Sequence, residues 1–231
     1  MNEPVLIAHR GLFDNQKMIE NTIPAFQKCI DQSIPFEFDI QLTLDNQLVV
    51  FHDDDLKRLA GKNMIIQEST YEELQSIPLL ESNSHIPLLK EVLELNQDKV
   101  FLDIEIKNTK RIKDTIFYLM KELEPYHHYS LKSFNPRIIR MIKKQYPAIS
   151  CGLLIHSHYD SKLHNFLFHT PFMIPFSKAD FLSIHKKLYP TKRYLNYSKK
   201  YPLQVWTIKN TEEIKDPNIT YICNELPYKK K

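Results

Sequence analysis

Glycine is scarce in this sequence, which has three glycines among 231 residues where an average composition would give about sixteen. Gly11, Gly61 and Gly152 stand too far apart to form a G-x-G-x-x-G or Walker A loop, the motifs that hold phosphate with backbone N–H groups. If this protein binds phosphate, it therefore has to use side chains or a metal ion.

Several other features are also missing. The three cysteines are odd in number, widely separated and flanked by apolar residues, which argues against a disulfide framework or a thiolate metal site. No apolar run is long enough to span a bilayer, and the start of the chain lacks a charged region followed by a long apolar one. We therefore expect a cytoplasmic protein with no stable membrane insertion.

The charge and the apolar content are ordinary. A net charge of +3, with basic residues spread along the chain, gives no strong case for a nucleic-acid surface, and we expect no nucleic-acid partner. An apolar fraction of 42% is typical of a soluble protein with a packed core. Length and composition together predict a single domain over residues 1–231.

Short apolar runs alternate with longer amphipathic ones along most of the chain. A further short run, Leu48–Phe51, follows the Phe36–Ile40 run after the turn-like Asp45-Asn46. Eight β-like segments separated mostly by helical ones predict an α/β protein with a TIM (β/α)8 barrel, and a doubly wound sheet is the main rival. The eight are Val5–Ala8, Phe36–Ile40, Val100–Ile106, Tyr129–Ser133, Cys151–Ile155, Phe181–Ile184, Leu203–Ile208 and Thr220–Cys223.

One stretch interrupts this alternation. Between Asp53 and Asp98 the sequence has no convincing barrel strand, but Thr70-x-x-Glu73 is a capping box that predicts the start of a short helix. We interpret residues 53–86 as a small helical insertion after the second strand.

Polar residues gather where four of the apolar runs end. His9-Arg10-Gly11 follows the first run, Glu37-x-Asp39 lies within the second, His52-Asp53 follows Leu48–Phe51, and Asp103-x-Glu105-x-Lys107 ends the Val100–Ile106 segment. Because strand side chains alternate, Glu37 and Asp39 share one face of their strand, and so do Asp103, Glu105 and Lys107.

Several carboxylates on an inward face require a positive partner. Glu37, Asp39 and Glu105 match the oxygen preference of Ca²⁺ or Mg²⁺, so we expect one divalent cation there. Lys107 and Arg10 are suited to phosphate oxygens.

His9 and His52 are suited to acid–base chemistry on a phosphodiester. The simpler alternatives are surface histidines, a solvated edge strand and a weak Glu105–Lys107 ion pair. The strands are too apolar for an edge, which favours the functional interpretation.

The order and spacing of these motifs resemble the glycerophosphodiester phosphodiesterase family over nearly the whole chain. The similarity is densest at the N-terminal end and continues in four segments downstream. The matching segments are Ala8-His9-Arg10-Gly11, Glu20-Asn21-Thr22 with Ala25-Phe26, Glu37-Phe38-Asp39-Ile40, Thr43-x-Asp45, Val49-Val50-Phe51-His52-Asp53, Ile86-Pro87-Leu88-Leu89-x-Glu91-Val92-Leu93, Ile104-Glu105-Ile106-Lys107, Ser133-Phe134 and Val205-Trp206-Thr207.

The resemblance implies a TIM barrel that hydrolyses glycerophosphodiesters to glycerol 3-phosphate and an alcohol with a divalent metal. It places the metal ligands on Glu37, Asp39 and Glu105, the catalytic histidines on His9 and His52, and the phosphate-contacting cations on Arg10 and Lys107. It also suggests Trp206 as a substrate-facing wall, for which a core tryptophan is the alternative. It puts Glu20 in a loop over the metal site, for which an acid that favours the start of the following helix is the alternative.

The chain departs from the family pattern at Ile19, where proline is usual, and at Ser33-Ile34-Pro35, where a glycine usually precedes the second strand. These changes leave the proposed chemistry intact but bear on the shape of the pocket. A lysophospholipase D is a second hydrolytic interpretation, for which residues 166–176 would supply an apolar groove, and a catalytically silent binding barrel is a third. The histidine-rich stretch of His156, His158, His164 and His169 is best explained as solvated positions, although His156 would reach the site if it ended a strand.

Overall fold

The computed structural model describes residues 5–158 and 173–226. The chain divides into two compact units, which we call the N-terminal unit (residues 8–129) and the C-terminal unit (residues 5–7, 130–158 and 173–226). Each is described by itself. The expectation of one domain over residues 1–231 stays a prediction.

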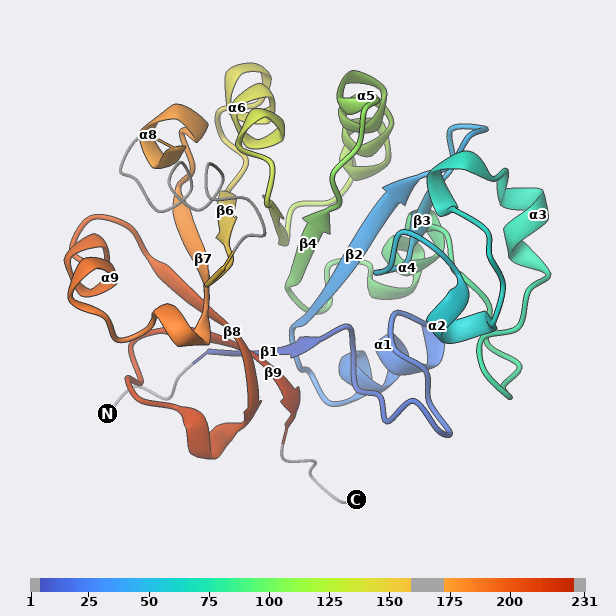
Figure 1. Ribbon diagram of the computed structural model, residues 1–231, viewed down its shortest axis with the longest axis horizontal. Coiled ribbons are helices and arrows are strands. Elements are labelled where there is room, and N and C mark those ends of the chain that lie inside the picture. Colours follow the sequence, from blue (N-terminus) through green and yellow to red (C-terminus); the bar gives the residue numbers. More distant parts are fainter. Residues whose placement is uncertain (1–4, 159–172, 227–231) are drawn as a thin grey trace. The chain divides into compact units, whose positions relative to one another are not determined.

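The N-terminal unit is built around strands that run parallel in sequence order (Figure 1). Strand β1 pairs with β2, and β2 pairs with β4. The run predicted at Leu48–Phe51 is the short strand β3, which pairs antiparallel with the end of β2 and is therefore not one of the parallel strands. The elements are β1 (Leu6–His9), α1 (Ile23–Asp31), β2 (Phe36–Leu42), β3 (Leu48–Val50), α4 (Leu89–Asn96), β4 (Leu102–Ile106) and α5 (Ile112–Leu123).

The predicted helical insertion follows β3. It contains α2 (Lys57–Ala60), the 3₁₀ turn η1 (Ile66–Glu68) and α3 (Tyr71–Gln75). Thr70 and Glu73 form the expected capping box, with the Thr70 side chain accepting from the Glu73 N–H. The insertion has its own buried apolar cluster, and Ile19, Val49 and Phe51 from outside the insertion belong to it. Hydrophobic burial therefore fixes the insertion to β3 and to the loop before α1.

The C-terminal unit continues the same alternation of strands and helices. Its five strands pair in parallel and in sequence order, from β5 to β9. Asn135 caps α6 by accepting the Arg137 N–H, and Pro136 is the first helical residue, as predicted. The elements are β5 (Tyr129–Ser133), α6 (Pro136–Gln145), β6 (Cys151–Ile155), α8 (Met173–Ser177), β7 (Phe181–His185), η2 (Lys186–Leu188), α9 (Lys192–Tyr197), β8 (Leu203–Asn210), η3 (Thr211–Glu213) and β9 (Thr220–Glu225).

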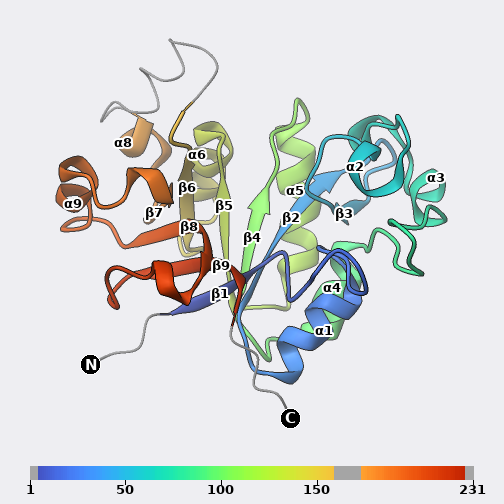
Figure 2. The ribbon, with the colours of Figure 1, turned by 60° about the horizontal axis from the view of Figure 1, so that its bottom comes forward.

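Eight parallel strands joined through helices make this a (β/α)8 barrel, as the sequence predicts. A doubly wound sheet would reverse its strand order at a switch point, and neither unit contains such a reversal. Helices lie on the outer side of the strands, with α1 beside α4 in one unit and α6 beside α8 in the other (Figure 2). Within the described ranges, no helix combines the length and the apolar character needed to cross a bilayer.

Candidate active site

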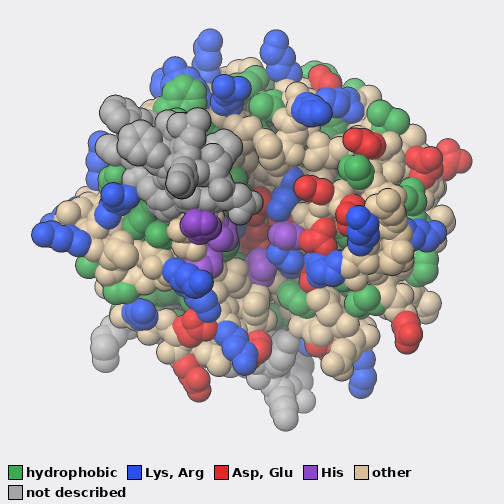
Figure 3. Space-filling model, viewed as in Figure 1, with side chains coloured by type: hydrophobic (Ala, Val, Ile, Leu, Met, Phe, Trp, Pro, Cys, Tyr) green, Lys and Arg blue, Asp and Glu red, His purple; other side chains and the backbone are tan. Residues whose placement is uncertain are grey.

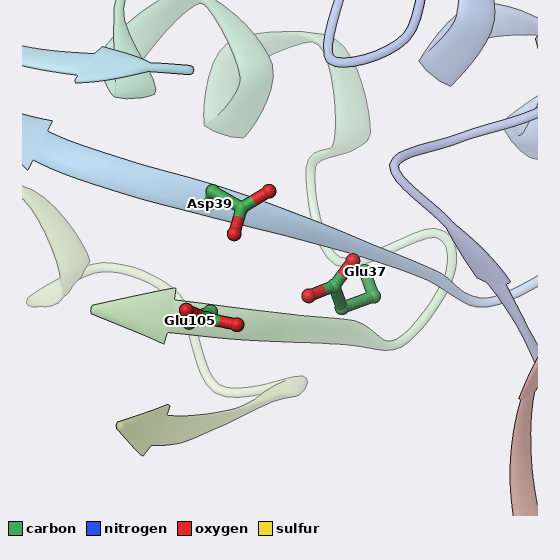
Figure 4. Close-up of side chains that lie close together, drawn as sticks. All are labelled: Glu37, Asp39 and Glu105. Atoms are coloured by element: carbon green, nitrogen blue, oxygen red, sulfur yellow. The ribbon is translucent and has the colours of Figure 1, made fainter. Parts of the chain in front are cut away.

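Three carboxylates meet on one face of the N-terminal unit. Glu37 and Asp39 come from β2 and Glu105 from β4, and their side chains point toward one another (Figure 4). One ligand oxygen from each lies within 4.8 Å of the others. The parallel register sets Asp39 directly beside Glu105, so the predicted grouping of the three is confirmed. Three buried carboxylates at this spacing could hold a metal ion.

The opposite face of β2 explains why these acids point inward. Phe36 and Phe38 alternate with them and pack against Phe26 of α1, with ring centroids 4.7 and 5.5 Å from that of Phe26. A shift of one residue in the register would bury the acids in this aromatic cluster and expose the rings, so the packing fixes the position of the site. Asp103 lies beside Glu37 on the same face of β4 and is buried, but it is not part of the trio.

Two basic side chains neutralise part of this charge. Lys107 Nζ lies 2.9 Å from Glu105 Oε1 and 3.4 Å from Asp39 Oδ1. Arg10 Nε lies 3.6 Å from Asp39 Oδ2, and the Arg10 backbone N–H donates to Glu37 Oε2 at 3.2 Å. The structure therefore brings Arg10 and Lys107 to the carboxylates, as the sequence predicts.

Charge pairing outweighs burial at this centre. Burial alone would raise the pKa of Asp39, but Lys107, His52 and Arg10 hold it well below its ordinary value. For Lys107, burial lowers the pKa and the neighbouring Glu105 and Asp39 raise it above its ordinary value. Both groups are therefore charged at neutral pH.

The two predicted histidines lie at the ends of β1 and β3. His9 is beside Glu37 in the parallel β1–β2 ladder. His52 Nδ1 lies 2.6 Å from Asp53 Oδ1, a hydrogen bond in which the ring nitrogen donates because the carboxylate accepts. In neutral His52 this bond favours the tautomer that leaves Nε2 without a proton.

Sequence reasoning missed part of the network around the trio. Asn21 Nδ2 donates to Asp39 Oδ2 at 3.0 Å, while the buried Asn21 Oδ1 has no hydrogen-bond partner within the described residues. Glu20 accepts hydrogen bonds from Asn15, Arg10 and Arg58. Asn15 and Asn21 adopt positive φ angles of 54° and 56°, which asparagine tolerates. The match of Glu20-Asn21-Thr22 to the family pointed to this loop, but it did not indicate these hydrogen bonds.

Glu20 is the most strongly held acid outside the trio. Its side chain is 3% exposed. Burial raises its pKa, but the hydrogen bonds from Arg58 and Asn15 and the charge of Arg10 together lower it to about 2. Glu20 is thus a buried anion near the trio, and its ion pairs make it more than an acid that favours the start of α1.

Over the N-terminal unit, acidic, basic and histidine side chains lie side by side on the surface (Figure 3). The trio contains only oxygen ligands, which fits a hard divalent cation better than zinc. Asn21 offers one more oxygen whose hydrogen-bonding capacity is unused. The donor set therefore fits the predicted cofactor class.

A comparison with protein families agrees with this site. Residues 9–220 match the model of the Glycerophosphoryl diester phosphodiesterase family. The chain belongs to this family. The matched range includes every candidate site residue named above.

Individual members of the glycerophosphoryl diester phosphodiesterase family give the same result. A glycerophosphodiester phosphodiesterase of Caldanaerobacter subterraneus subsp. tengcongensis is 34% identical over 162 residues, which cover 65% of this chain and 66% of that protein. The matched part thus spans slightly less than two thirds of that relative. A lysophospholipase D of Mus musculus is 31% identical over 60% of this chain and 48% of its own.

A solved structure shares the fold over nearly the full length. It is an Oleispira antarctica phosphodiesterase in complex with the product sn-glycerol-3-phosphate, with a TM-score of 0.79 and 21% identity. The match covers 96% of this chain and 93% of that one. It supports the (β/α)8 barrel for this member of the family.

The two departures from the family pattern have local structural consequences. Ser33, in the Ser33-Ile34-Pro35 segment where the family usually has glycine, has a φ of 55°, a conformation that glycine adopts more easily. Ile19, where the family usually has proline, is fully buried in the apolar cluster of the insertion. Neither residue belongs to the trio or to its basic partners.

Trp206 lies in the C-terminal unit, on β8. Its Nε1 donates to the Ser183 carbonyl at 3.0 Å, and its ring contacts Phe134, His156 and His185 with centroid distances of 5.1–5.6 Å. His156 directly follows the last residue of β6. His164, His169 and most of the 166–176 segment lie outside the described residues. The role of Trp206 as a substrate wall stays a prediction.

Proposed function

We propose that this chain hydrolyses glycerophosphodiesters to glycerol 3-phosphate and an alcohol, using one divalent cation, Ca²⁺ or Mg²⁺. The observation that carries the proposal is the buried trio of Glu37, Asp39 and Glu105 with Lys107 and Arg10 beside it, in a member of this family. The Oleispira antarctica phosphodiesterase, which shares the fold and was solved with its product sn-glycerol-3-phosphate, supports the same product here.

Charge balance supports a cation and a phosphodiester at this centre. The trio carries three negative charges, and Lys107 and Arg10 supply two positive ones, which leaves one negative charge among buried groups. A divalent cation together with a phosphodiester monoanion brings one net positive charge. The trio, its two basic partners, the cation and the diester are together neutral, so the cation and the diester offset the remaining charge of the buried trio.

The side chains divide the remaining work. When bound by Glu37, Asp39 and Glu105, the cation supplies Lewis-acid polarisation of a phosphate oxygen. Arg10 and Lys107 bind the other phosphate oxygens and stabilise the charge that develops in the transition state.

The histidines handle the protons. His52, with Nδ1–H held by Asp53, acts in its doubly protonated form and donates the Nε2 proton to the leaving alkoxide. His9 accepts the proton of the nucleophile, which is either water or the glycerol 2-hydroxyl. Attack by the 2-hydroxyl expels the alcohol and forms a cyclic phosphate, which a water then opens to glycerol 3-phosphate.

The decisive experiment is release of glycerol 3-phosphate from a small panel of glycerophosphodiesters, with Ca²⁺, with Mg²⁺ and with a chelator. We expect turnover that needs a divalent cation and is lost in Glu37→Gln and His9→Ala, while Glu94→Gln, at an exposed position of α4, serves as the matched control. A purified protein that releases no glycerol 3-phosphate from any diester with either cation would refute the proposal and favour a silent binding barrel.

A second candidate is a lysophospholipase D, because one relative at 31% identity carries that name. It would act on the same head group with one acyl chain attached. Turnover of glycerophosphocholine and of lysophosphatidylcholine at equal concentration separates the two activities. We also propose that the substrate is a small molecule, that the protein has no nucleic-acid partner, and that it is located in the cytoplasm.

A further inference from the structure

Arg58 joins two acidic residues that each hold a group of the proposed machinery. It lies on α2, within the insertion. Its Nε donates to Asp53 Oδ2 at 2.6 Å, and its Nη1 and Nη2 donate to Glu20 Oε2 and Oε1 at 3.0 and 2.7 Å. All three guanidinium nitrogens are therefore used, and the pair with Glu20 is bidentate.

Each of these acids has a second partner. The other oxygen of Asp53 lies 2.6 Å from His52 Nδ1, and Glu20 Oε1 also accepts from Arg10 Nη1 at 2.7 Å. One continuous series of ion pairs thus runs from His52 through Asp53, Arg58 and Glu20 to Arg10.

We propose that Arg58 is a positioning residue that fixes the ring of His52 and the guanidinium of Arg10 in place, so that the insertion is part of the catalytic apparatus. This inference rests on the proposed function, since it assigns His52 the proton transfer and Arg10 the phosphate.

The geometry favours positioning over a surface ion pair. The Arg58 side chain is 43% exposed, but Glu20 is 3% exposed, so the guanidinium reaches from the surface to a buried carboxylate. An exposed pair alone contributes little, whereas a planar fork that holds two carboxylates at fixed angles restricts both. A lysine at this position has the charge but not the fork, and cannot orient Asp53 and Glu20 together.

Arg58 is not needed to hold the insertion in the fold. The apolar cluster that fixes the insertion includes Leu56 and Leu59 on either side of it. Without Arg58, Glu20 keeps Asn15 and Arg10 as partners, and Asp53 keeps His52. Arg58 variants should therefore fold, with the two catalytic groups less well oriented.

The test compares wild type, Arg58→Lys and Arg58→Met, with Lys57→Met as the matched control on the same helix, where Lys57 pairs only with Asp55 among the described residues. Two substrates are used: glycerophosphocholine, whose alkoxide needs a proton, and the p-nitrophenyl ester of glycerol 3-phosphate, whose leaving group does not. We expect both Arg58 variants to lose kcat on glycerophosphocholine by about 10- to 100-fold, the usual effect of removing an outer-shell partner.

The loss on the p-nitrophenyl ester should be at least about tenfold smaller, since proton donation contributes about 10²- to 10⁴-fold only where the leaving group needs it. A rise in KM for both substrates would show that Arg10, which binds the phosphate, is also less well oriented in the Arg58 variants. Lys57→Met should match wild type on both. A purely structural role would lower both activities equally and would overturn the proposal.

A second readout does not depend on turnover. Two-dimensional ¹⁵N–¹H spectra of the imidazole at a pH where His52 is neutral report which ring nitrogen carries the proton. We expect a single tautomer with Nδ1 protonated in wild type and a mixture in Arg58→Met. An unchanged tautomer and ring environment in Arg58→Met would refute the positioning role. Because this readout needs no turnover, it tests Arg58 even if the wild-type protein hydrolyses no diester and the proposed function has failed.

Discussion

Gly11 offers the sharpest test of how the backbone shapes this site. It follows His9 and Arg10, has a φ of +84°, and lies where a Cβ would meet Ala25 Cβ at 3.0 Å and the Ala25 carbonyl carbon at 3.1 Å. Both atoms belong to the buried face of α1. Gly11→Ala would therefore bring both a strained backbone and a steric clash with a helix that is packed on β2.

The magnitude follows from these two contributions. A non-glycine residue with left-handed φ costs about 1–2 kcal/mol, and overpacking a core by one methyl group costs about 1–3 kcal/mol. Gly61 isolates the first contribution, because its φ is +66° and, apart from Gly61 and its two chain neighbours, no atom of the described residues lies within 4 Å of the position of a Cβ. We therefore expect Gly11→Ala to lose about 2–5 kcal/mol and Gly61→Ala about 1–2 kcal/mol.

Thermal unfolding measures the difference directly. For a chain of this size each kcal/mol shifts Tm by about 2–4 °C, so the two variants should differ in Tm by several degrees. Equal losses of Tm would refute the steric part of the reasoning.

Activity supplies the second half of the test. The Arg10 N–H donates to Glu37 at 3.2 Å, so displacement of the neighbouring Gly11 moves both a phosphate-binding group and its link to the trio. At a temperature where both variants are folded, kcat/KM should fall in Gly11→Ala and stay at the wild-type value in Gly61→Ala. Full activity in Gly11→Ala would show that this turn does not position Arg10.

Three further outcomes are expected. Burial raises the pKa of Glu122 to about 7 against the opposing charge of Lys90, and its buried Oε2 has no hydrogen-bond partner among the residues that the structure describes. The folded state therefore keeps a proton that the unfolded state releases, so the free energy of unfolding falls as pH rises from about 4.5 through 7. Glu122→Gln should raise the free energy of unfolding by about 1–2 kcal/mol at pH 8 but by little at pH 4. An equal rise at both pH values would contradict this. For Glu20, whose pKa is lowered to about 2, the sign is opposite. Its contribution to the free energy of unfolding, roughly 3 kcal/mol, is complete above pH 4.5 and declines toward pH 2. The urea midpoint of Glu20→Gln should therefore depend less on pH between 6 and 3 than that of wild type. Finally, Lys107→Met removes a positive charge beside the carboxylates of Asp39 and Glu105. Ca²⁺ or Mg²⁺ should therefore raise the Tm of this variant by more than it raises the Tm of wild type. A Tm that neither cation changes would argue against a metal at the trio.

The fold was largely predictable because its signals are local. Apolar residues at alternate positions predicted strands at Phe36–Ile40 and Val100–Ile106, and the structure has them at Phe36–Leu42 and Leu102–Ile106. The same alternation places Glu37 and Asp39 on one face of β2 and Glu105 on one face of β4. The capping box at Thr70 and Glu73 needs only four consecutive residues. Each of these features is decided within a few residues of itself.

The remainder depends on contacts between distant parts of the chain. Arg58 and Glu20 are 38 residues apart, and nothing around either one indicates that they pair. The antiparallel direction of β3 depends on its pairing with β2, which an apolar run of three residues cannot specify. The aromatic contacts of Trp206, within β8, join it to residues at the ends of three other strands of the C-terminal unit, β5, β6 and β7. Alternation along one strand carries no information about any of these contacts.

The scarcity of glycine has a physical counterpart in this site. A glycine-rich loop binds phosphate with backbone dipoles and needs little charge, whereas this centre combines a carboxylate trio with Lys107 and Arg10. Charged side chains are longer and more mobile than a backbone loop, so they need partners that hold them in position. Glu20, Asn21 and Arg58 provide such contacts within the N-terminal unit. A site built from side chains therefore requires a larger polar network around it, which accounts for the buried ion pairs that extend from the trio into the insertion.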